Sequence, residues 1–309
     1  MKPLVSIIIP VYNGENYMRE AIDSALAQTY ENVEILVVND GSTDNQRTEQ
    51  IALSYGDRIR YISKKNGGSS SALNEGIKNM KGDYFSWLSH DDLYRPDKIE
   101  KQVAACSLIN PNDTVVVCHG ELIDTNGNAM MSKPEHMKGR ADAAASLARL
   151  SHGKGINGCG ILISRALIER TGYFDEEMVY LNDLDYWWRL IMGDVSIFFI
   201  PEKLVKTRIH GNQVSVTKRE KFDVERHYLA NKLLGQVRNA KMDKQTVLKQ
   251  IAYFCATENL SAEYQQAKKK LSANGWYKIT DGLFFRMVWL LGSLKKVMKW
   301  VRKKILFSR

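Results

Sequence analysis

Residues 33–44 read Val-Glu-Ile-Leu-Val-Val-Asn-Asp-Gly-Ser-Thr-Asp. The first half is rich in β-branched and apolar residues, which favours a buried strand. Asp40 and Gly41 then favour a turn, and Ser42 and Thr43 are residue types that cap helices. A strand, a turn and a helix start in this order predict a βα unit, from which parallel sheets are built.

The same alternation continues on both sides of this stretch. Because short β-branched runs alternate with apolar residues at helical spacing, we expect a mixed, mainly parallel α/β sheet flanked by helices, with a helical extension toward the C-terminus. The predicted strands cover residues 5–9, 33–39, 59–63, 84–88, 115–118, 160–164, 196–200 and 205–209. The predicted helices cover residues 17–26, 43–55, 70–80 and 184–192, with one more after Pro96 and a helical period from residue 219 to about 275.

The positive charge of the chain is concentrated at one end. The 309 residues carry a net charge of +9, but residues 283–309 hold eight Lys and Arg side chains and no acidic one, so residues 1–282 have a net charge of +1. A nucleic-acid-binding body carries basic side chains across its own surface. We therefore expect a nearly neutral body with a basic tail, not a nucleic-acid-binding body. The composition of 44% hydrophobic and 26% charged residues favours a folded protein over a disordered or disulfide-stapled one.

Cysteine usage and the first residues favour a cytoplasmic protein. The four cysteines are widely spaced and form no Cys-x-x-Cys pair, so we expect reduced thiols. The apolar run at residues 4–9 is shorter than the apolar region of a signal peptide and is followed by no small-residue cleavage site. No apolar run reaches the roughly 20 residues that a membrane-spanning helix needs, so we expect any membrane contact to be peripheral.

Polar segments follow four of the predicted strands. They read Pro-Val-Tyr-Asn-Gly-Glu at residues 10–15, Asn-Asp-Gly-Ser-Thr-Asp at 39–44, Asn-Gly-Gly at 66–68 and Ser-His-Asp-Asp at 89–92. Ligands of open parallel sheets bind beyond the carboxyl ends of the strands. We therefore expect the chemistry of the protein at these four segments.

Taken together, the segments resemble those of the large family 2 of inverting nucleotide-sugar glycosyltransferases, with which their order and spacing agree over about residues 4–215. Members of that family have a GT-A fold, a Rossmann-like fold that begins with a Pro-x-Tyr-Asn strand end, an Asp-Gly-Ser-x-Asp turn and an acidic metal motif. The resemblance implies an enzyme of the hexosyltransferase type, which moves a sugar from a nucleotide diphosphate sugar to an acceptor with inversion.

The resemblance also implies a set of donor-binding residues. Asp40 is expected to accept a hydrogen bond from a base N–H or a ribose hydroxyl, and the alternative is a turn aspartate that caps the following helix. The family frequently has an Arg where this chain has Leu73, and Lys64 and Lys65 are candidate substitutes. The implied nucleotide-binding residues are Pro10 and Tyr12 against the base, Glu15 near the ribose, and Asp40, Asn66 and Gly67.

A metal site is implied at the end of the fourth predicted strand. Mn²⁺ and Mg²⁺ prefer hard oxygen ligands, and Asp91 and Asp92 are the expected ligands of an ion that bridges a diphosphate. Asp92 has two alternatives, which are capping the following helix and holding an acceptor hydroxyl. Ser89 stands where the family often has another Asp, so one carboxylate of the family's motif is absent here.

The expected general base is Asp183. Residues 182–189 read Asn-Asp-Leu-Asp-Tyr-Trp-Trp-Arg and resemble the family's Glu-Asp-x-x-x-Trp-x-Arg motif, whose catalytic Asp falls on Asp183. Inverting transfer needs a carboxylate to deprotonate the acceptor hydroxyl. Asp185 is expected to cap the helix or to form an ion pair. Trp187 has two interpretations, stacking on a sugar ring or packing in the core.

Two further segments resemble parts of the family's site. Residues 157–160, Asn-Gly-Cys-Gly, resemble the small-residue segment that lines the donor sugar, and they also fit an ordinary turn before a strand. Residues 208–215 resemble a segment near the end of the catalytic domain, where a cation or a His closes over the diphosphate. A structural role is the alternative for the His. The implied donor- or acceptor-sugar residues are Gly158, Trp187 and His210.

The basic tail has the pattern of an interfacial helix. Between residues 287 and 305, apolar residues recur at three- and four-residue steps, Lys and Arg occupy the remainder, and Trp289 and Trp300 lie on the flanks. This pattern favours a helix on an anionic membrane, and the alternative is packing on the body or on a second subunit. The expected regions are a catalytic domain at residues 1–218, a helical extension at 219–282 and a membrane-associating helix at 283–309.

The expected function is transfer from a nucleotide diphosphate sugar, in the first place a UDP-sugar, to a lipid-linked glycan in polysaccharide biosynthesis. Mn²⁺ or Mg²⁺ is the expected cofactor, and the inner face of the cell membrane is the expected location. Within the family, a dTDP-rhamnosyl or GDP-sugar transferase is the alternative. From a different class, a non-catalytic nucleotide-sugar-binding scaffold of a glycan assembly complex stays open, because Ser89 and Leu73 replace an expected Asp and Arg.

Overall fold

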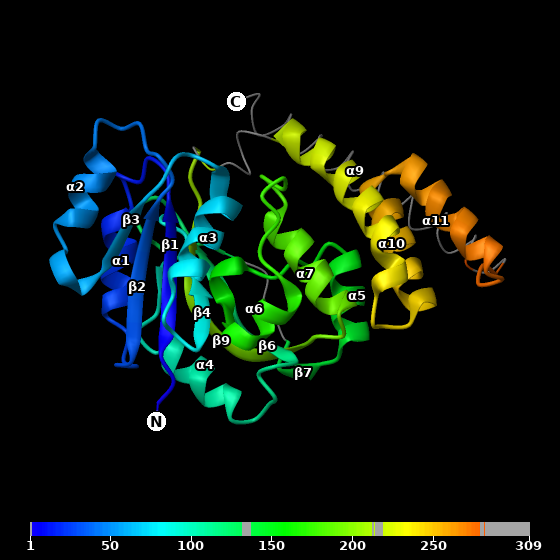
Figure 1. The fold of residues 1–309 in the computed structure, drawn as a ribbon, viewed down its shortest axis with the longest axis horizontal. Helices are drawn as coiled ribbons and strands as arrows, with labels where there is room; N and C mark the ends of the chain where they lie inside the picture. Colours follow the sequence, from blue (N-terminus) through cyan, green and yellow to red (C-terminus); the bar gives the residue numbers. More distant parts are fainter. Residues whose placement is uncertain (1, 132–136, 212, 214–218, 279–280, 282–309) are drawn as a thin grey trace. The chain divides into compact units, whose positions relative to one another are not determined.

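The computed structural model describes residues 2–131, 137–211, 213, 219–278 and 281 (Figure 1). The chain divides into two compact units. The first comprises Met1–Asp142, Ile156–Leu190 and Val195–Arg219, and the second comprises Ala143–Gly155, Ile191–Asp194 and the chain from Glu220 onward. The expected membrane-associating segment, residues 283–309, lies outside the described residues.

One mixed sheet runs through the first unit. Within the described residues, its strand order is β3-β2-β1-β4-β8-β6-β9-β5, with β7 paired to β9. β1 is parallel to β2 and β4, β2 is parallel to β3, β8 is antiparallel to β4 and β6, and β6 is parallel to β9. This order confirms the predicted mixed α/β architecture. The strands are β1 (Val5–Val11), β2 (Val33–Asn39), β3 (Arg60–Ser63), β4 (Tyr84–Trp87), β5 (Leu93–Tyr94), β6 (Thr114–Ile123), β7 (Gly139–Ala141), β8 (Ile161–Ser164) and β9 (Ser196–Arg208).

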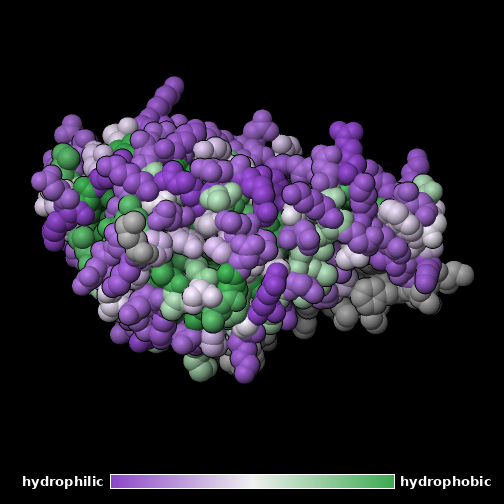
Figure 2. Space-filling view, turned by 60° about the horizontal axis from the view of Figure 1, so that its bottom comes forward, coloured by the Kyte–Doolittle hydropathy of each residue, from purple (hydrophilic) through white to green (hydrophobic). Residues whose placement is uncertain are grey.

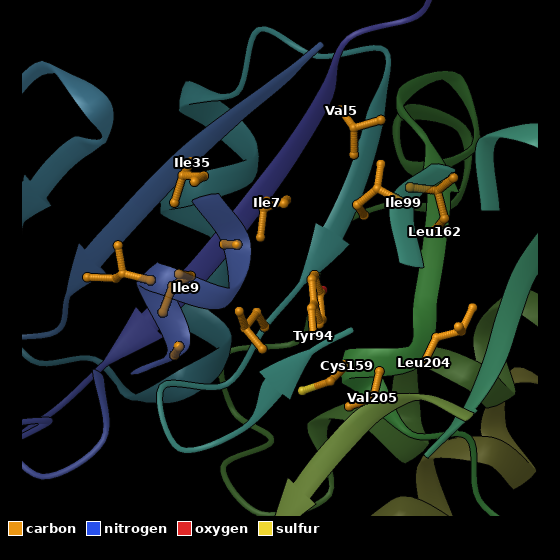
Figure 3. Close-up of a cluster of buried hydrophobic side chains, with 14 of the residues drawn as sticks. Val5, Ile7, Ile9, Ile35, Tyr94, Ile99, Cys159, Leu162, Leu204 and Val205 are labelled. Carbon is orange, nitrogen blue, oxygen red and sulfur yellow. The ribbon is translucent and has the colours of Figure 1, made fainter. Parts of the chain in front are cut away.

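Helices cover both faces of this sheet, because successive side chains of a strand point to opposite faces. Ile7 and Ile9 of β1 point into a buried cluster that also contains Ile99 of α4 (Figure 3). Ile8 points to the other face, where α3 crosses so closely that a Cβ on Gly76 would lie 2.4 Å from Cγ2 of Ile8. The helices of this unit are α1 (Met18–Leu26), α2 (Arg47–Leu53), α3 (Gly68–Asn79), α4 (Lys98–Cys106), α6 (Arg165–Thr171) and the greater part of α7 (Asn182–Met192).

Some elements differ from the prediction for backbone reasons. The helix predicted over residues 43–55 begins only at Arg47, because Asn45 and Gln46 have φ values of 56° and 66°, outside the right-handed helical region. The two strands predicted near the end of this unit form one strand, β9, whose pairing with β6 shifts in register beside His119. The short strands β5 and β7 are not predicted, because two or three residues carry no recognisable period.

The second unit is helical. It contains α5 (Ala143–Ser151), nearly all of α9 (Arg219–Gln236), α10 (Lys244–Glu258) and α11 (Ser261–Ala273). Ser151 Oγ donates to Gln250 Oε1 (2.6 Å), and the His152 ring stacks on Tyr253 with 4.0 Å between ring centroids, so α5 packs with the C-terminal helices. The apolar residues predicted to form helix faces here are buried, namely Leu229, Leu233, Leu234, Val237, Val247, Leu248, Ile251 and Phe254.

The face of the molecule shown in Figure 2 is largely hydrophilic. On this face, hydrophobic side chains form smaller patches between the hydrophilic ones. Among the described helices, none is both long enough and apolar enough to cross a membrane.

Candidate active site at the carboxyl ends of the strands

Parallel strands bring the expected segments to one edge of the sheet. Val11 pairs with Asn39, and Asn39 pairs with Ser63, so β1, β2 and β3 end side by side. β4 runs beside β1 in the same direction, and residues 89–92 follow it. The four segments that the sequence singles out are therefore neighbours in the fold.

Asp40 holds two of these loops together. The residue is 3% exposed, and its carboxylate accepts hydrogen bonds from Nζ of Lys64 (2.8 Å) and from the backbone N–H groups of Gly67 (2.9 Å) and Gly68 (2.7 Å). A carboxylate has about four acceptor positions, so Asp40 keeps capacity for one donor group of a ligand. Asp40 does not cap α2, which begins only at Arg47, and the two N–H groups that it accepts lie at the start of α3.

Glycine is required where these loops touch. A Cβ on Gly41, whose φ is 68°, would lie 2.7 Å from the backbone N of Asn66. A Cβ on Gly67 would lie 2.7 Å from Oγ of Ser71. Asn66 itself is exposed. The loops after β2 and β3 thus pack at a separation that larger residues would prevent, with Asn66 at the surface.

The loop after β1 is tied to the loop after β2. Oδ1 of Asn13 accepts a hydrogen bond from the backbone N–H of Thr43 (2.7 Å). Tyr12 is 45% exposed, whereas Pro10 is buried within β1. Glu15 forms a 2.6 Å ion pair with the arginine that begins α2. The Tyr12 ring is therefore open to a planar ligand, while Glu15 is held by a cation of the protein.

The loop after β4 meets the segment after β9. Nε2 of His210 lies 3.1 Å from Oδ2 of Asp91, and the two side chains are 14% and 17% exposed. A carboxylate and an imidazole thus face each other at a partly open position. In the part of the chain that the structure describes, no three or more His, Cys, Asp and Glu side chains gather as a metal site. The pair by itself is therefore not a complete metal cage.

Asp92 is engaged by the protein itself. It is 5% exposed, its Oδ1 accepts a hydrogen bond from the backbone N–H of Arg208 (3.0 Å), and its Oδ2 accepts one from the thiol of Cys159 (3.2 Å). Burial, assisted by the charge of Asp91, raises the pKa of Asp92 to about 7. Asp92 therefore anchors its loop to the segments before β8 and at the end of β9, and both of its oxygens have protein partners.

Arg208 lies in the segment where the resemblance implies a cation or a His over the diphosphate, but acceptors of the protein itself bind its guanidinium. The residue is 1% exposed, and its guanidinium donates to the carbonyl oxygens of Asp91 (3.1 Å) and Thr125 (3.0 Å) and to Oε2 of Glu20 (2.7 Å). It also lies 4.4 Å from the centre of the Tyr17 ring. A charged residue in a strand is ordinarily assigned to solvent, so only the folded chain reveals that Arg208 fixes the loop of Asp91.

Asp183 lies in the first turn of α7. Its side chain is partly buried, its Oδ1 accepts a hydrogen bond from the N–H of Leu184 (2.6 Å), and burial raises its pKa to about 6. A carboxyl group with this pKa is ionised at neutral pH and can accept a proton. Asp185 is fully buried and forms a 2.8 Å ion pair with Arg189. An ion pair is one of the two roles that the sequence predicts for Asp185.

Two of the expected sugar-binding residues pack in the interior. Trp187 is 1% exposed and meets Tyr186 edge-on, with 5.6 Å between ring centroids. Its ring offers no open face to a sugar, which agrees with the core interpretation. Gly158 is buried against Trp87, whose ring atoms would lie 2.6 Å from a Cβ at that position. The small residue allows this close packing beside the end of β4.

Comparisons with known proteins agree with this arrangement. Residues 6–172 match the family model described as Glycosyl transferase family 2. The chain is 44% identical to an uncharacterised glycosyltransferase of Rickettsia prowazekii over 97% of both proteins, and 48% identical to a hyaluronan synthase of Pasteurella multocida over 70% of this chain and 21% of that protein. Its fold matches S. aureus TarS in complex with UDP-GlcNAc with a TM-score of 0.67 over 84% of this chain and 73% of that chain, at 19% identity. The chain therefore belongs to glycosyltransferase family 2 and is a glycosyltransferase with the GT-A fold.

Proposed function

We propose that the protein transfers a sugar from a UDP-sugar, with inversion, to a lipid-linked glycan at the inner face of the cell membrane. The observation that carries the proposal is the pairing of Asp91 with His210 at the sheet edge where Asp40 organises the neighbouring loops. TarS in complex with UDP and with UDP-GlcNAc supports a uridine donor. The similarity to a hyaluronan synthase supports a saccharide acceptor.

The pairing of Asp40 with Lys64 fits the edge of a uracil base. Asp40 offers an acceptor, and Nζ of Lys64, which already donates to Oδ1 of Asp40 (2.8 Å) and to the carbonyl oxygen of Lys65 (2.7 Å), offers one further donor. Uracil presents an N3–H donor flanked by carbonyl acceptors, which complements such a pair. The exposed ring of Tyr12 supports stacking on the base. Guanine offers a similar N1–H and O6 edge, so the GDP-sugar alternative is tested alongside.

The residues around Asp91 fit a divalent ion whose coordination a diphosphate completes. Mg²⁺ and Mn²⁺ are often bound by one or two protein ligands together with substrate phosphates. Asp91 and His210 would hold the ion, while Asp92 keeps their loop in place through its contacts with Cys159 and Arg208. When bound, such an ion neutralises charge that develops on the leaving diphosphate.

Asp183 is the proposed base for the transfer. The acceptor oxygen forms a new bond to the anomeric carbon, the bond from that carbon to the diphosphate oxygen breaks, and the hydroxyl proton moves to Asp183. Attack opposite the leaving group inverts the configuration. The pKa of about 6 leaves the Asp183 carboxyl ionised at neutral pH, as this role requires.

The basic tail supports an acceptor carried on a lipid. Residues 283–309 hold eight basic side chains and no acidic one, and each Lys or Arg near an anionic surface contributes about 1 kcal/mol to binding. Attachment of this segment to the inner face of the membrane would bring the catalytic unit to a saccharide held there.

Thermal stability of the purified chain with nucleotides tests the donor. A ligand that binds only the folded state raises its Tm. We expect UDP with Mn²⁺ to raise the Tm more than UDP alone, and more than GDP or dTDP with Mn²⁺. A metal-dependent shift confined to GDP or dTDP would assign that base instead. No shift with any nucleotide would contradict the proposed donor site.

A further inference from the structure

Helix α3 carries two buried polar side chains that the site described above does not use. Ser70 and Asn74 are 2% and 3% exposed and lie one helical turn apart. A buried polar group costs free energy unless it forms hydrogen bonds. The hydrogen-bond partners of the two side chains therefore indicate which part of the fold they hold in place. All of these partners lie on the segment that leads into α7.

Asn74 uses both ends of its amide on that segment. Its Nδ2 donates to the carbonyl oxygen of Phe174 (2.9 Å) and to Oε1 of Glu176 (2.9 Å), and its Oδ1 accepts from the N–H of Phe174 (3.0 Å). Oγ of Ser70 donates to the carbonyl oxygen of Met178 (2.9 Å). Alternate residues from 174 to 178 are thus fixed to α3, and only a side chain that both donates and accepts can make the three Asn74 bonds.

The same segment is fixed from α7 as well. Arg189 donates to the carbonyl oxygen of Tyr173 (2.9 Å), and the Phe174 ring stacks on Tyr186 with 4.3 Å between ring centroids. The Phe174 ring also meets Trp87 edge-on at 5.8 Å. Segment 173–178 is therefore packed between α3, α7 and the end of β4, and α7 begins shortly after it.

Helix α3 also takes part in the donor site. It begins at Gly68, whose backbone N–H donates to Asp40. One short, rigid helix thus contacts the expected nucleotide loop at its first residue and the segment before Asp183 at its second turn. Since a displacement of about 1 Å in a reacting group can cost on the order of a hundredfold in rate, a fixed distance between these two regions has a direct consequence for transfer.

We propose that Asn74 is a positioning residue for Asp183, because its amide fixes the segment that sets the start of α7. This inference rests on the proposed function, in which Asp183 is the base. Asn74 contacts no substrate in this proposal. It acts on the rate of transfer and leaves the affinity for the nucleotide to Asp40 and its loops.

Two substitutions of Asn74 in the full-length chain test the inference. Asn74→Ala removes all three bonds, and Asn74→Asp replaces two donors by an acceptor that faces Glu176. We expect kcat for UDP release from UDP-GlcNAc to fall by at least about tenfold, while the UDP affinity measured by calorimetry stays close to that of the wild type. Hydrogen exchange at residues 174–178 and 182–184 is expected to accelerate in both variants.

A matched control and a rescue sharpen this test. Asn79→Ala removes an amide from the same helix whose hydrogen bonds, among the described residues, go to Glu75, and it should leave kcat unchanged. In the double variant Asn74→Asp with Glu176→Gln, the new Gln amide can donate to the new carboxylate, so part of the lost kcat is expected to return.

Three results would overturn the inference. The first is a kcat of folded Asn74→Ala equal to that of the wild type. The second is a loss of UDP affinity in the Asn74 variants as large as their loss of kcat. The third is a loss of kcat in Asn79→Ala as large as that in Asn74→Ala. A different variant tests the proposed function, because full activity of Asp183→Asn would show that Asp183 is not the base. The exchange rates of the Asn74 variants do not depend on that outcome, so the two failures are distinguishable.

Discussion

Nε2 of His210 lies 3.1 Å from Oδ2 of Asp91, although the two residues are 119 positions apart in the chain. Asp91 follows β4, and His210 follows β9. Arg208 connects the same two places, since its side chain donates to the carbonyl oxygen of Asp91 and its backbone N–H donates to Asp92. Contacts within the fold therefore hold both members of the pair in place. A ligand that binds between two loops requires such a fixed position.

Asp91→Asn and His210→Ala should each weaken UDP binding in the presence of Mn²⁺. We expect the Kd to rise by at least about tenfold with Mn²⁺ and to change little without it, because the two side chains are proposed to act through the ion. Calorimetry with and without Mn²⁺ measures this. Asp57→Asn, which alters an exposed carboxylate of the same unit, is the control. Equal affinities with Mn²⁺ for all three variants would contradict a metal role of the pair.

Arg208→Met should destabilise the protein strongly. The substitution removes a buried guanidinium together with its charge-assisted hydrogen bonds to the carbonyl oxygens of Asp91 and Thr125, and we expect the free energy of unfolding to fall by about 3 kcal/mol. Glu20→Gln is the matched variant, because Glu20 is 54% exposed and its partnership should contribute less than about 1 kcal/mol. Urea denaturation measures both. Similar small losses in the two variants would show that Arg208 is not a structural centre of the site.

The pH dependence of transfer should follow Asp183. Because burial raises its pKa from 3.8 to about 6, the base is protonated below that pH, and kcat/KM should fall about tenfold per pH unit there. The effect on stability has the opposite sign. The folded state binds the Asp183 proton more tightly than the unfolded chain, so this contribution to stability decreases as the pH rises from 3.8 to about 6.

Values of kcat/KM for the UDP-sugar, measured between pH 5 and 8 with Mn²⁺, give this acidic limb. UDP affinity over the same range separates the base from the donor site, since only the rate should follow Asp183. A rate that stays constant down to pH 5 is incompatible with Asp183 as the base.

Gly158→Ala should destabilise the fold beside β4. The new Cβ would lie 2.6 Å from ring atoms of Trp87, and overpacking of this kind typically costs about 1–3 kcal/mol. Gly155→Ala is the control, because a Cβ there meets no atom within 4 Å and should change the free energy of unfolding by less than about 0.5 kcal/mol. Thermal denaturation compares the stability of the two variants. Equal Tm values for Gly158→Ala and Gly155→Ala would show that the contact with Trp87 relaxes without loss of stability.

Removal of residues 283–309 should abolish binding to vesicles that contain anionic lipid and leave UDP affinity unchanged. The segment supplies eight basic side chains, and the attraction to anionic lipid weakens as salt screens it. Vesicle sedimentation at low and high salt measures the effect. Equal sedimentation of the truncated and the full-length chain would place the membrane contact elsewhere or exclude it.

Much of the sheet could be predicted because its strands are continuous apolar runs. The predicted strand at residues 33–39 has the bounds of β2, since a parallel strand buried on both faces leaves a clear pattern. The start of α2 was not predictable in the same way. It depends on Asn45 and Gln46, whose positive φ values are set within a loop that also bonds to the preceding loop through Asn13.

The positions of the site loops were predictable, but the partners of their side chains were not. Asp40 and Asp91 stand at strand ends where the sequence places them. Whether a polar residue is buried, however, depends on segments that are distant in the chain. The role of Asn74 depends on residues about 100 positions later. A local pattern contains none of this information.

UDP release is the measurement that tests the proposed reaction most directly. The full-length chain and Asp183→Asn are compared with UDP-GlcNAc, Mn²⁺ and a saccharide acceptor, after calorimetry has shown that both bind UDP. We predict that the wild type releases UDP and that Asp183→Asn loses at least about a hundredfold in rate at an unchanged UDP affinity. Undiminished UDP release by Asp183→Asn would contradict the assignment of Asp183 as the base that drives transfer.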